Sequence, residues 1–254
     1  MNQTGSSLLL GSVLFAFQIY GDFSGYSDIA IGSARLFGFK LMRNFAFPYF
    51  SRDMAEFWRR WHISLSTWFR DYIYIPLGGS KVKKIKMTRN IFVIFLLSGL
   101  WHGANWTFLL WGFVNACYVL PLAIMGVNRK HTNIVAEFRP FPTLVEILQI
   151  LGTFLLTSIA WIFFRAQTVS DAFSILGRVF SPSLFSIPHS VPPFLILSIL
   201  GLVVIEWFQR KKQHGLEISR SKNLLLLRWT AYLGIFILII ALGGSQQEFI
   251  YFQF

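Results

Sequence analysis

The stretch IFVIFLLSGLWHGANWTFLLWGFVNACYVLPLAIM, residues 91–125, decides the fold of this chain. It carries no acidic or basic side chain except His102, and it is much longer than the roughly 20 apolar residues that one bilayer crossing needs. The SGLWHGANW segment at its middle holds glycine, serine and asparagine residues that can interrupt a helix. The pattern predicts a segment that crosses twice or re-enters, with His102 at a break that faces an interior space.

The composition of the whole chain indicates an integral membrane protein. Hydrophobic residues make up 54% of the 254 residues and aromatic residues 18%, which is high for an ordinary soluble domain. The single cysteine, Cys117, excludes an intrachain disulfide and a cysteine-based metal site. We therefore expect an all-α, polytopic transmembrane protein, with apolar segments at about 7–20, 23–39, 91–101, 104–125, 143–164, 193–208 and 224–243.

The formal net charge of +12 comes largely from three basic connections, at 81–89, 128–139 and 209–222. Basic connections between apolar segments are typical of cytoplasmic loops, so the charge indicates membrane topology and lipid contact, not nucleic-acid binding. An even number of crossings must then separate the first two connections. This agrees with a segment 91–125 that crosses twice or re-enters, and the three apolar segments after it then alternate in direction.

Residues 51–72 predict a different kind of element. Asp53 and Glu56 have the spacing of a helix-capping box. The apolar residues that follow recur at helical spacing and predict an amphipathic helix in the membrane interface. They are Met54, Phe57, Trp58, Trp61, Leu65, Trp68, Phe69 and Tyr72. His62 lies at the edge of this stripe, so it is either a functional residue or a histidine whose polar end reaches the interface.

His102 is the first candidate for catalysis. An ionisable residue at membrane depth is costly and therefore marks a functional site. A buried imidazole stays uncharged and can accept a proton from a hydroxyl, as a general base does. We expect Asn105 to orient the ring or a substrate, and Trp101, Trp106 and Trp111 to form a wall or a lid. The alternative is a histidine that only packs between helices.

A second polar cluster lies at residues 22–28, between two apolar arms. It contains Asp22, Ser24, Tyr26 and Asp28. Carboxylates at bilayer depth are costly, so we expect the cluster either to lie at the interface or to bond internally and with arginines. The candidate arginines are Arg35, Arg59 and Arg60. The alternative is a purely structural polar turn.

Two other kinds of chemistry are disfavoured by the sequence. The histidines lie far apart, with no HExxH motif and no second ligand at helical spacing, so we expect no metal site. Ser24-Gly25 lacks the G-x-S-x-G pattern and the preceding strand of a serine nucleophile.

Several motifs resemble the membrane-bound O-acyltransferase family, and within it the alginate O-acetylation type. The resemblance extends over nearly the whole chain. The motifs are DFSGYSDIAIG (22–32), NFAFPYFSRDMAEFWRRWHISLSTWFRDYIYIPLGG (44–79), SGLWHGANWTFLLWG (98–112), WIFFRAQTVSDAFSIL (161–176) and FIYFQF (249–254). The D-alanyl transfer branch shares WRRWHIS and GLWHG, but GANWTFLLWG and IPLGG favour the alginate type.

The resemblance implies that His102 is the catalytic histidine and that His62 is a second important one in the same tunnel. It implies transfer of an acyl group, usually acetyl, from a thioester donor such as acetyl-CoA or an acyl carrier. The acceptor would be a hydroxyl of an extracytoplasmic polysaccharide, with periplasmic partner proteins, at the bacterial inner membrane and without a tightly bound cofactor. His62, Asn105 or a tryptophan N–H would bind the acyl oxygen, and the sequence does not choose among them.

The chain departs from the family pattern in one respect. Members of the family are normally much longer, with several spans before the DFSGYSD motif, so residues 1–254 resemble the C-terminal portion of the enzyme. The sequence leaves open a fragment, a split enzyme and a non-catalytic remnant or scaffold subunit. A transporter is a further alternative, although the chain shows no repeat and only one obvious helix break.

Overall fold

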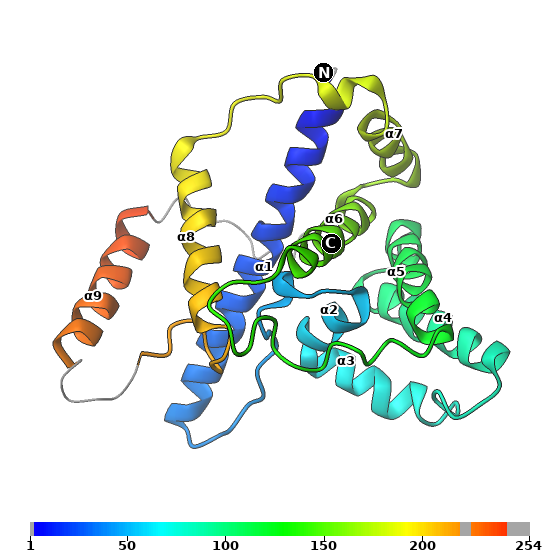
Figure 1. Ribbon diagram of the computed structural model, residues 1–254, viewed down its shortest axis with the longest axis horizontal. Helices are drawn as coiled ribbons and strands as arrows, with labels where there is room; N and C mark the ends of the chain where they lie inside the picture. Colours follow the sequence, from blue (N-terminus) through cyan, green and yellow to red (C-terminus); the bar gives the residue numbers. More distant parts are fainter. Residues whose placement is uncertain (1–2, 219–224, 243–254) are drawn as a thin grey trace.

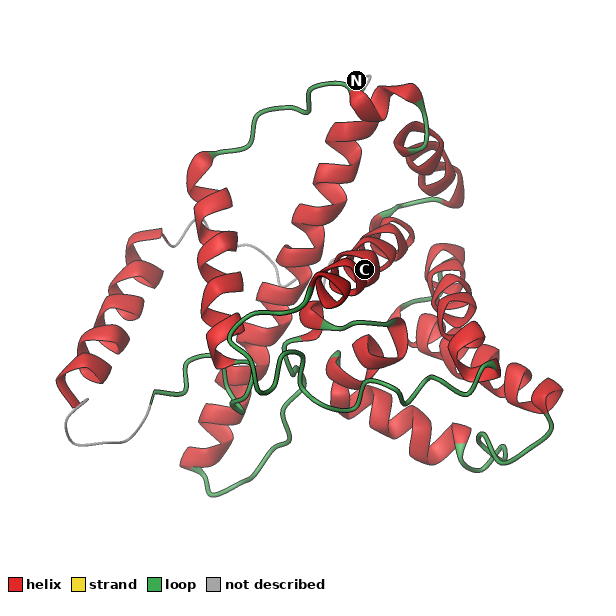
Figure 2. Ribbon diagram, viewed as in Figure 1, coloured by secondary structure: helices red, strands yellow, loops and turns green. Residues whose placement is uncertain are grey.

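The computed structural model describes residues 3–218 and 225–242, and it is built from helices (Figure 1 and Figure 2). No strand occurs within these ranges, so the prediction of an all-α polytopic membrane protein is confirmed. The motif at 249–254 lies outside the described residues. The elements are α1 (Gly5–Leu36), η1 (Pro48–Phe50), α2 (Met54–Arg60), α3 (Ile63–Phe69), η2 (Arg70–Tyr74), α4 (Lys84–His102), α5 (Trp106–Ile124), α6 (Leu144–Arg165), α7 (Val169–Val179), η3 (Pro182–Phe185), α8 (Pro193–Gln209) and α9 (Leu225–Leu242).

Three of the described helices, α1, α5 and α6, are long and apolar enough to cross a membrane. Two shorter apolar helices, α8 and α9, follow them in the chain. In Figure 1, α6 lies between α1 and the α4–α5 pair, and α8 runs along the other side of α1. The residues around His62 and His102 come from α2, α3, α4, α5 and α6.

Helix α1 is continuous through the apolar segments predicted at 7–20 and 23–39, and it ends at Leu36. The polar residues between them do not break the helix, since no proline intervenes. Thr4 caps its first turn by accepting a hydrogen bond from the Ser7 N–H. The segment at 22–28 is consequently helical and is not a turn.

The predicted break in residues 91–125 is confirmed. Helix α4 ends at His102 and α5 begins at Trp106, so the two helices form an antiparallel hairpin. Helix α4 also reaches back into the basic connection, with Lys84, Lys86 and Arg89 in its first turns, which explains why it is not among the three spanning candidates.

Two glycines let α4 and α5 pack backbone to backbone. A Cβ atom at Gly99 would lie 2.3 Å from the Phe108 carbonyl oxygen, and one at Gly112 would lie 2.3 Å from that of Phe95. Such close approach excludes any side chain at either position. The packing places His102, at the end of α4, against the inner face of α5.

The predicted amphipathic helix at 51–72 is divided in two at His62. Trp61 is extended, with φ −104° and ψ 130°, and His62 is left-handed, with φ 44° and ψ 56°. Neither conformation continues a right-handed helix. Asp53 caps α2 as expected, whereas the Glu56 carboxylate accepts from the Arg52 N–H at 2.8 Å.

The apolar stripe of this region packs inside the protein. Met54, Phe57 and Trp61 are each at most 2% exposed and belong to a large aromatic core. Trp68 and Tyr72, farther along, are exposed. The stripe thus anchors α2 to α6 and η1, and only its later part presents aromatic side chains outward.

Candidate functional site

The two histidines line one cavity of about 100 Å³. His62 comes from the junction between α2 and α3, and His102 comes from the last position of α4. The cavity walls are mostly aromatic and apolar. The lining residues are Trp58, Trp61, His62, Leu65, Ser66, Phe69, Ile94, Phe95, Ser98, His102, Trp111 and Trp161.

Aromatic rings surround the His102 imidazole. Its ring centroid lies 5.2 Å from that of Trp111 and 5.0 Å from that of Phe164, and both rings stand nearly perpendicular to it. Trp111 belongs to α5 and Phe164 to α6. Three helices therefore fix the orientation of His102, which suits a group that must meet a reacting atom in one geometry.

His62 is buried, with 8% of its surface exposed, and it adopts a left-handed backbone conformation. This conformation is rare for a residue other than glycine and costs about 1–3 kcal/mol, so the surrounding contacts must impose it. Burial lowers the pKa of His62, so its imidazole is neutral at pH 7. A neutral imidazole has one nitrogen that donates and one that accepts, as proton-transfer chemistry requires.

Trp101 links the two histidines. Its ring centroid lies 5.9 Å from that of His62 and 5.0 Å from that of His102. The Trp101 side chain is 55% exposed and contacts both imidazoles without lining the cavity itself. Trp106 is 73% exposed and does not line the cavity either, so Trp111 is the one of the three tryptophans predicted as a wall or a lid that lines it.

Asn105 caps helix α5. Its side-chain oxygen accepts from the Thr107 N–H at 3.1 Å, and its side-chain nitrogen donates to the Gln167 carbonyl at 3.2 Å. Both ends of the amide are thus used to start α5 and to hold the chain after α6. A role for Asn105 in orienting the imidazole or the substrate remains a prediction.

The cluster at 22–28 lies between the histidine cavity and a second, larger cavity. Phe23 contacts the His62 ring at 4.6 Å between centroids. Ser24 and Asp28 line the second cavity, which has a volume of about 1280 Å³ and is bounded by α1, α8, α9 and the segments 43–47 and 213–218. Asp22 and Tyr26 are exposed. The four candidate residues therefore do not line the cavity of the histidines.

The arginines expected to pair with this cluster have other partners. Arg59 donates to the carbonyls of Asn128 at 2.7 Å and His131 at 2.8 Å. Arg60 forms an ion pair with the buried Glu56 at 2.8 Å. Asp28 instead lies 3.6 Å from His214, which also contacts Arg35. Arg59 and Arg60 thus fasten the connection after α5 to α2.

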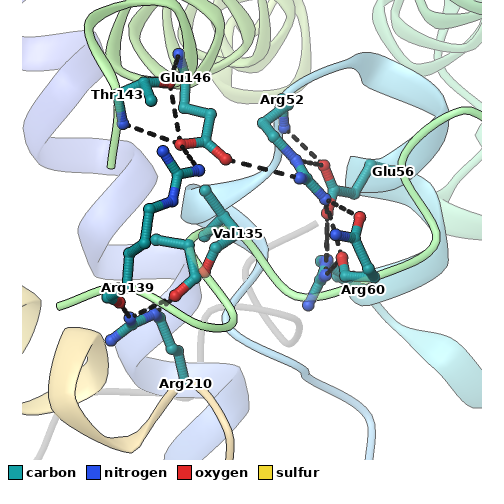
Figure 3. Close-up of polar contacts among 10 residues, drawn as sticks. Arg52, Glu56, Arg60, Val135, Arg139, Thr143, Glu146 and Arg210 are labelled. Atoms are coloured by element: carbon teal, nitrogen blue, oxygen red, sulfur yellow. Dashed lines mark hydrogen bonds and ion pairs between the residues drawn. The ribbon is translucent and has the colours of Figure 1, made fainter. Parts of the chain in front are cut away.

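Glu56 is the centre of this polar network (Figure 3). It is 1% exposed and pairs with Arg52 at 3.0 Å as well as with Arg60. Figure 3 shows Arg52 also turned toward Glu146 at the start of α6, with 3.9 Å between the charged atoms. The network holds α2, and with it the segment that carries His62, against α6.

Sequence reasoning missed several residues of the site. Trp58 and Trp161 line the histidine cavity, and their indole N–H groups are buried without an acceptor among the described residues. Tyr20 donates to the Glu206 carboxylate beside the second cavity. An acidic residue inside the apolar segment 193–208 was the one sequence signal for this pair.

No group of three or more His, Cys, Asp or Glu side chains in the described ranges is arranged to hold a metal ion. The cavity itself offers two imidazoles within a largely aromatic and apolar lining.

The sequence model of the membrane-bound O-acyltransferase family matches residues 2–165. The chain belongs to this family, and the match includes both histidines of the cavity. The resemblance seen in the motifs is thereby confirmed.

Curated relatives include a probable alginate O-acetylase AlgI of Pseudomonas aeruginosa, 43% identical over 180 residues, or 71% of this chain and 32% of the relative. A peptidoglycan O-acetyltransferase of Helicobacter pylori is 42% identical over 165 residues, or 65% and 30%. A teichoic acid D-alanyltransferase of Bacillus subtilis is 34% identical over 126 residues, or 43% and 32%. The matched segment is thus about a third of each relative's length.

Proposed function

We propose that this chain takes part in transferring an acetyl group from a thioester donor to a hydroxyl of an extracytoplasmic polysaccharide, or to a relay partner. The observation that carries the proposal is the single cavity lined by both His62 and His102. Two of the relatives described above are named as O-acetylating proteins, which supports acetyl as the group transferred.

In the proposed reaction, His102 acts as general base. The acceptor O–H gives its proton to the imidazole while its oxygen attacks the thioester carbonyl carbon. The C–S bond then breaks, and the leaving thiolate takes this proton from the imidazolium, so the imidazole returns to its neutral form. General-base action contributes about 10²–10⁴-fold, and orientation in an enclosed site contributes more.

The acyl oxygen gains negative charge in this reaction and needs hydrogen-bond donors. The indole N–H groups of Trp58 and Trp161 are available donors among the residues that line the cavity. His62 is a third candidate, because its neutral ring carries one N–H. Of the donors considered from the sequence, Asn105 is the least suited, since its amide is already bonded.

The donor and partners of the reaction follow from the same proposal. Acetyl-CoA or an acyl carrier would supply the thioester as a co-substrate, and the chain would hold no resident cofactor. Periplasmic acetylation proteins would complete transfer to the polymer, and the chain would lie in the bacterial inner membrane. Residues 1–254 would act there as the C-terminal portion of an O-acyltransferase domain.

Cells that carry His102→Ala or His62→Ala in the full-length protein provide the test. Base-released acetate from surface polysaccharide should fall to the level of a deletion strain, while immunoblots show normal amounts in the membrane. His189→Ala is the matched control, because His189 is an exposed histidine that does not line the cavity. Unchanged acetate in both cavity variants would remove the histidines from the chemistry.

D-alanine is the alternative group, because a relative named as a D-alanyltransferase also matches the chain. The same base-released material distinguishes the two reactions, since it would then contain D-alanine in place of acetate. Release of neither compound by the wild-type protein would support a non-catalytic remnant.

A further inference from the structure

Two backbone hydrogen bonds enclose His62. The Ala46 N–H donates to the Arg60 carbonyl at 3.0 Å, and the Ile63 N–H donates to the Asn44 carbonyl at 2.9 Å. The chain at 44–46 therefore runs beside the segment that carries His62 and holds it on both sides. These bonds explain how a left-handed residue is kept between two right-handed helices.

The Asn44 side chain adds a cap to helix α3. His62 stands at the N-cap position but provides no side-chain cap itself. The Asn44 Oδ1 atom instead accepts from the Ser64 N–H at 3.3 Å and from the Ser64 hydroxyl at 2.6 Å. Together with its carbonyl, Asn44 satisfies the N–H groups of the first two residues of α3, which have no partner within the helix.

Asn44 also connects α3 to α1. Its Nδ2 atom donates to the Ser27 hydroxyl oxygen at 3.2 Å. One helical turn before Ser27, Phe23 packs its ring edge to face with His62. The imidazole is thus held between α1 and Trp101, and Asn44 connects these surroundings to the backbone of His62.

We infer that Asn44 is the positioning residue of His62. It sets the left-handed backbone and the start of α3, and so directs the His62 imidazole into the cavity shared with His102. The effect of Asn44 on activity rests on the proposed function, whereas its effect on the position of the His62 imidazole does not. The Asn44 Oδ1 atom thus bonds to the first turn of α3 from outside that helix.

The reactivity of each histidine measures this effect without any assay of acyl transfer. Diethyl pyrocarbonate modifies neutral, accessible imidazoles, and peptide mass spectrometry gives the rate at each site in the full-length protein in membranes. In Asn44→Ala we expect a several-fold faster rate at His62, with rates at His102 and His131 unchanged. Asn44→Asp keeps the acceptor for Ser64 and should resemble the wild type. Asn128→Ala is the matched control, because only the Asn128 backbone is engaged.

Activity adds a second readout. Asn44→Ala should lower kcat by about tenfold with little change in KM, because the imidazole is misplaced and substrate binding is not lost. Asn44→Asp should restore most of kcat. An unchanged His62 rate in Asn44→Ala, or an equal rise at His62, His102 and His131, would overturn the inference. If His62→Ala and His102→Ala both kept full activity, the proposed function would be contradicted. The diethyl pyrocarbonate rates at His62 would still test the role of Asn44.

Discussion

Gly99 of α4 and Phe108 of α5 lie so close that a Cβ atom on the glycine would be 2.3 Å from the phenylalanine carbonyl oxygen. The same contact occurs in the opposite direction, since a Cβ atom on Gly112 of α5 would be 2.3 Å from the Phe95 carbonyl oxygen of α4. This double contact fixes the register of the hairpin and, through it, the position of His102 one turn beyond Gly99. The catalytic proposal therefore depends on two residues that carry no functional group.

Gly99→Ala or Gly112→Ala should separate α4 from α5 and displace His102. We expect loss of most acyl-transfer activity and a destabilisation of about 1–3 kcal/mol, as overpacking in a tight contact produces. Thermal unfolding in detergent measures the second effect. Gly201→Ala on α8 is the control, because no atom lies within 4 Å of a Cβ there, and it should leave both properties unchanged. Equal behaviour of the three variants would contradict the packing argument.

The left-handed backbone of His62 predicts that two variants at this position differ in stability although both lack activity. His62→Gly should be more stable than His62→Ala by about 1 kcal/mol, since glycine adopts this conformation without steric cost. Both variants should be inactive if the imidazole is required. Thermal unfolding of the two purified proteins gives the comparison. A more stable alanine variant would show that the left-handed conformation does not exist in the protein.

The buried network around Glu56 predicts a strong effect on folding. Glu56→Ala leaves Arg52 and Arg60 without their shared carboxylate, and removing one partner of a buried pair costs about 3–5 kcal/mol. The amount of folded protein in the membrane should fall sharply. Asp71→Ala removes the exposed partner of Arg70 and should have little effect. Comparable losses in the two variants would argue against the network as an anchor of α2.

Burial of His62 predicts how stability changes with pH. Its pKa is lower in the folded protein than in the unfolded chain, so the unfolded chain binds more protons in acid. His62 should therefore destabilise the protein progressively as the pH falls below about 6.5, the ordinary histidine pKa. His62→Asn tolerates a left-handed backbone and carries no such proton. The melting-temperature difference between wild type and His62→Asn should shift in favour of the variant between pH 7 and pH 5, and a constant difference would contradict this.

Sequence patterns predicted the elements that depend on local signals. The break in the apolar run at 91–125 follows from small and polar residues at one place, and the structure ends α4 at His102 as expected. The division of 51–72 at His62 could not be predicted, because the left-handed residue is held by Asn44, which is distant in sequence. Helical periodicity continues through that point and gives no sign of the change.

The hydrogen-bond and ion-pair partners of the polar side chains could not be predicted from local sequence patterns either. The sequence predicted Arg60 near the carboxylates of 22–28. Arg60 instead forms an ion pair with Glu56, which lies four residues before it on the same helix. Trp58 and Trp161 appeared in sequence as ordinary aromatic residues. Only the folded arrangement shows that both line the histidine cavity with buried, unpartnered N–H groups.

Acetyl transfer, measured in membranes that contain the full-length protein and a labelled acetyl thioester, tests most directly whether His102 acts as the general base. His102→Gln keeps a polar side chain but cannot act as a base near neutral pH. We predict transfer to the polymer at wild-type rates for the His189→Ala control and at least about 10²-fold less for His102→Gln, at equal protein levels. Transfer by His102→Gln at the wild-type rate would contradict the assignment of this cavity as the active site.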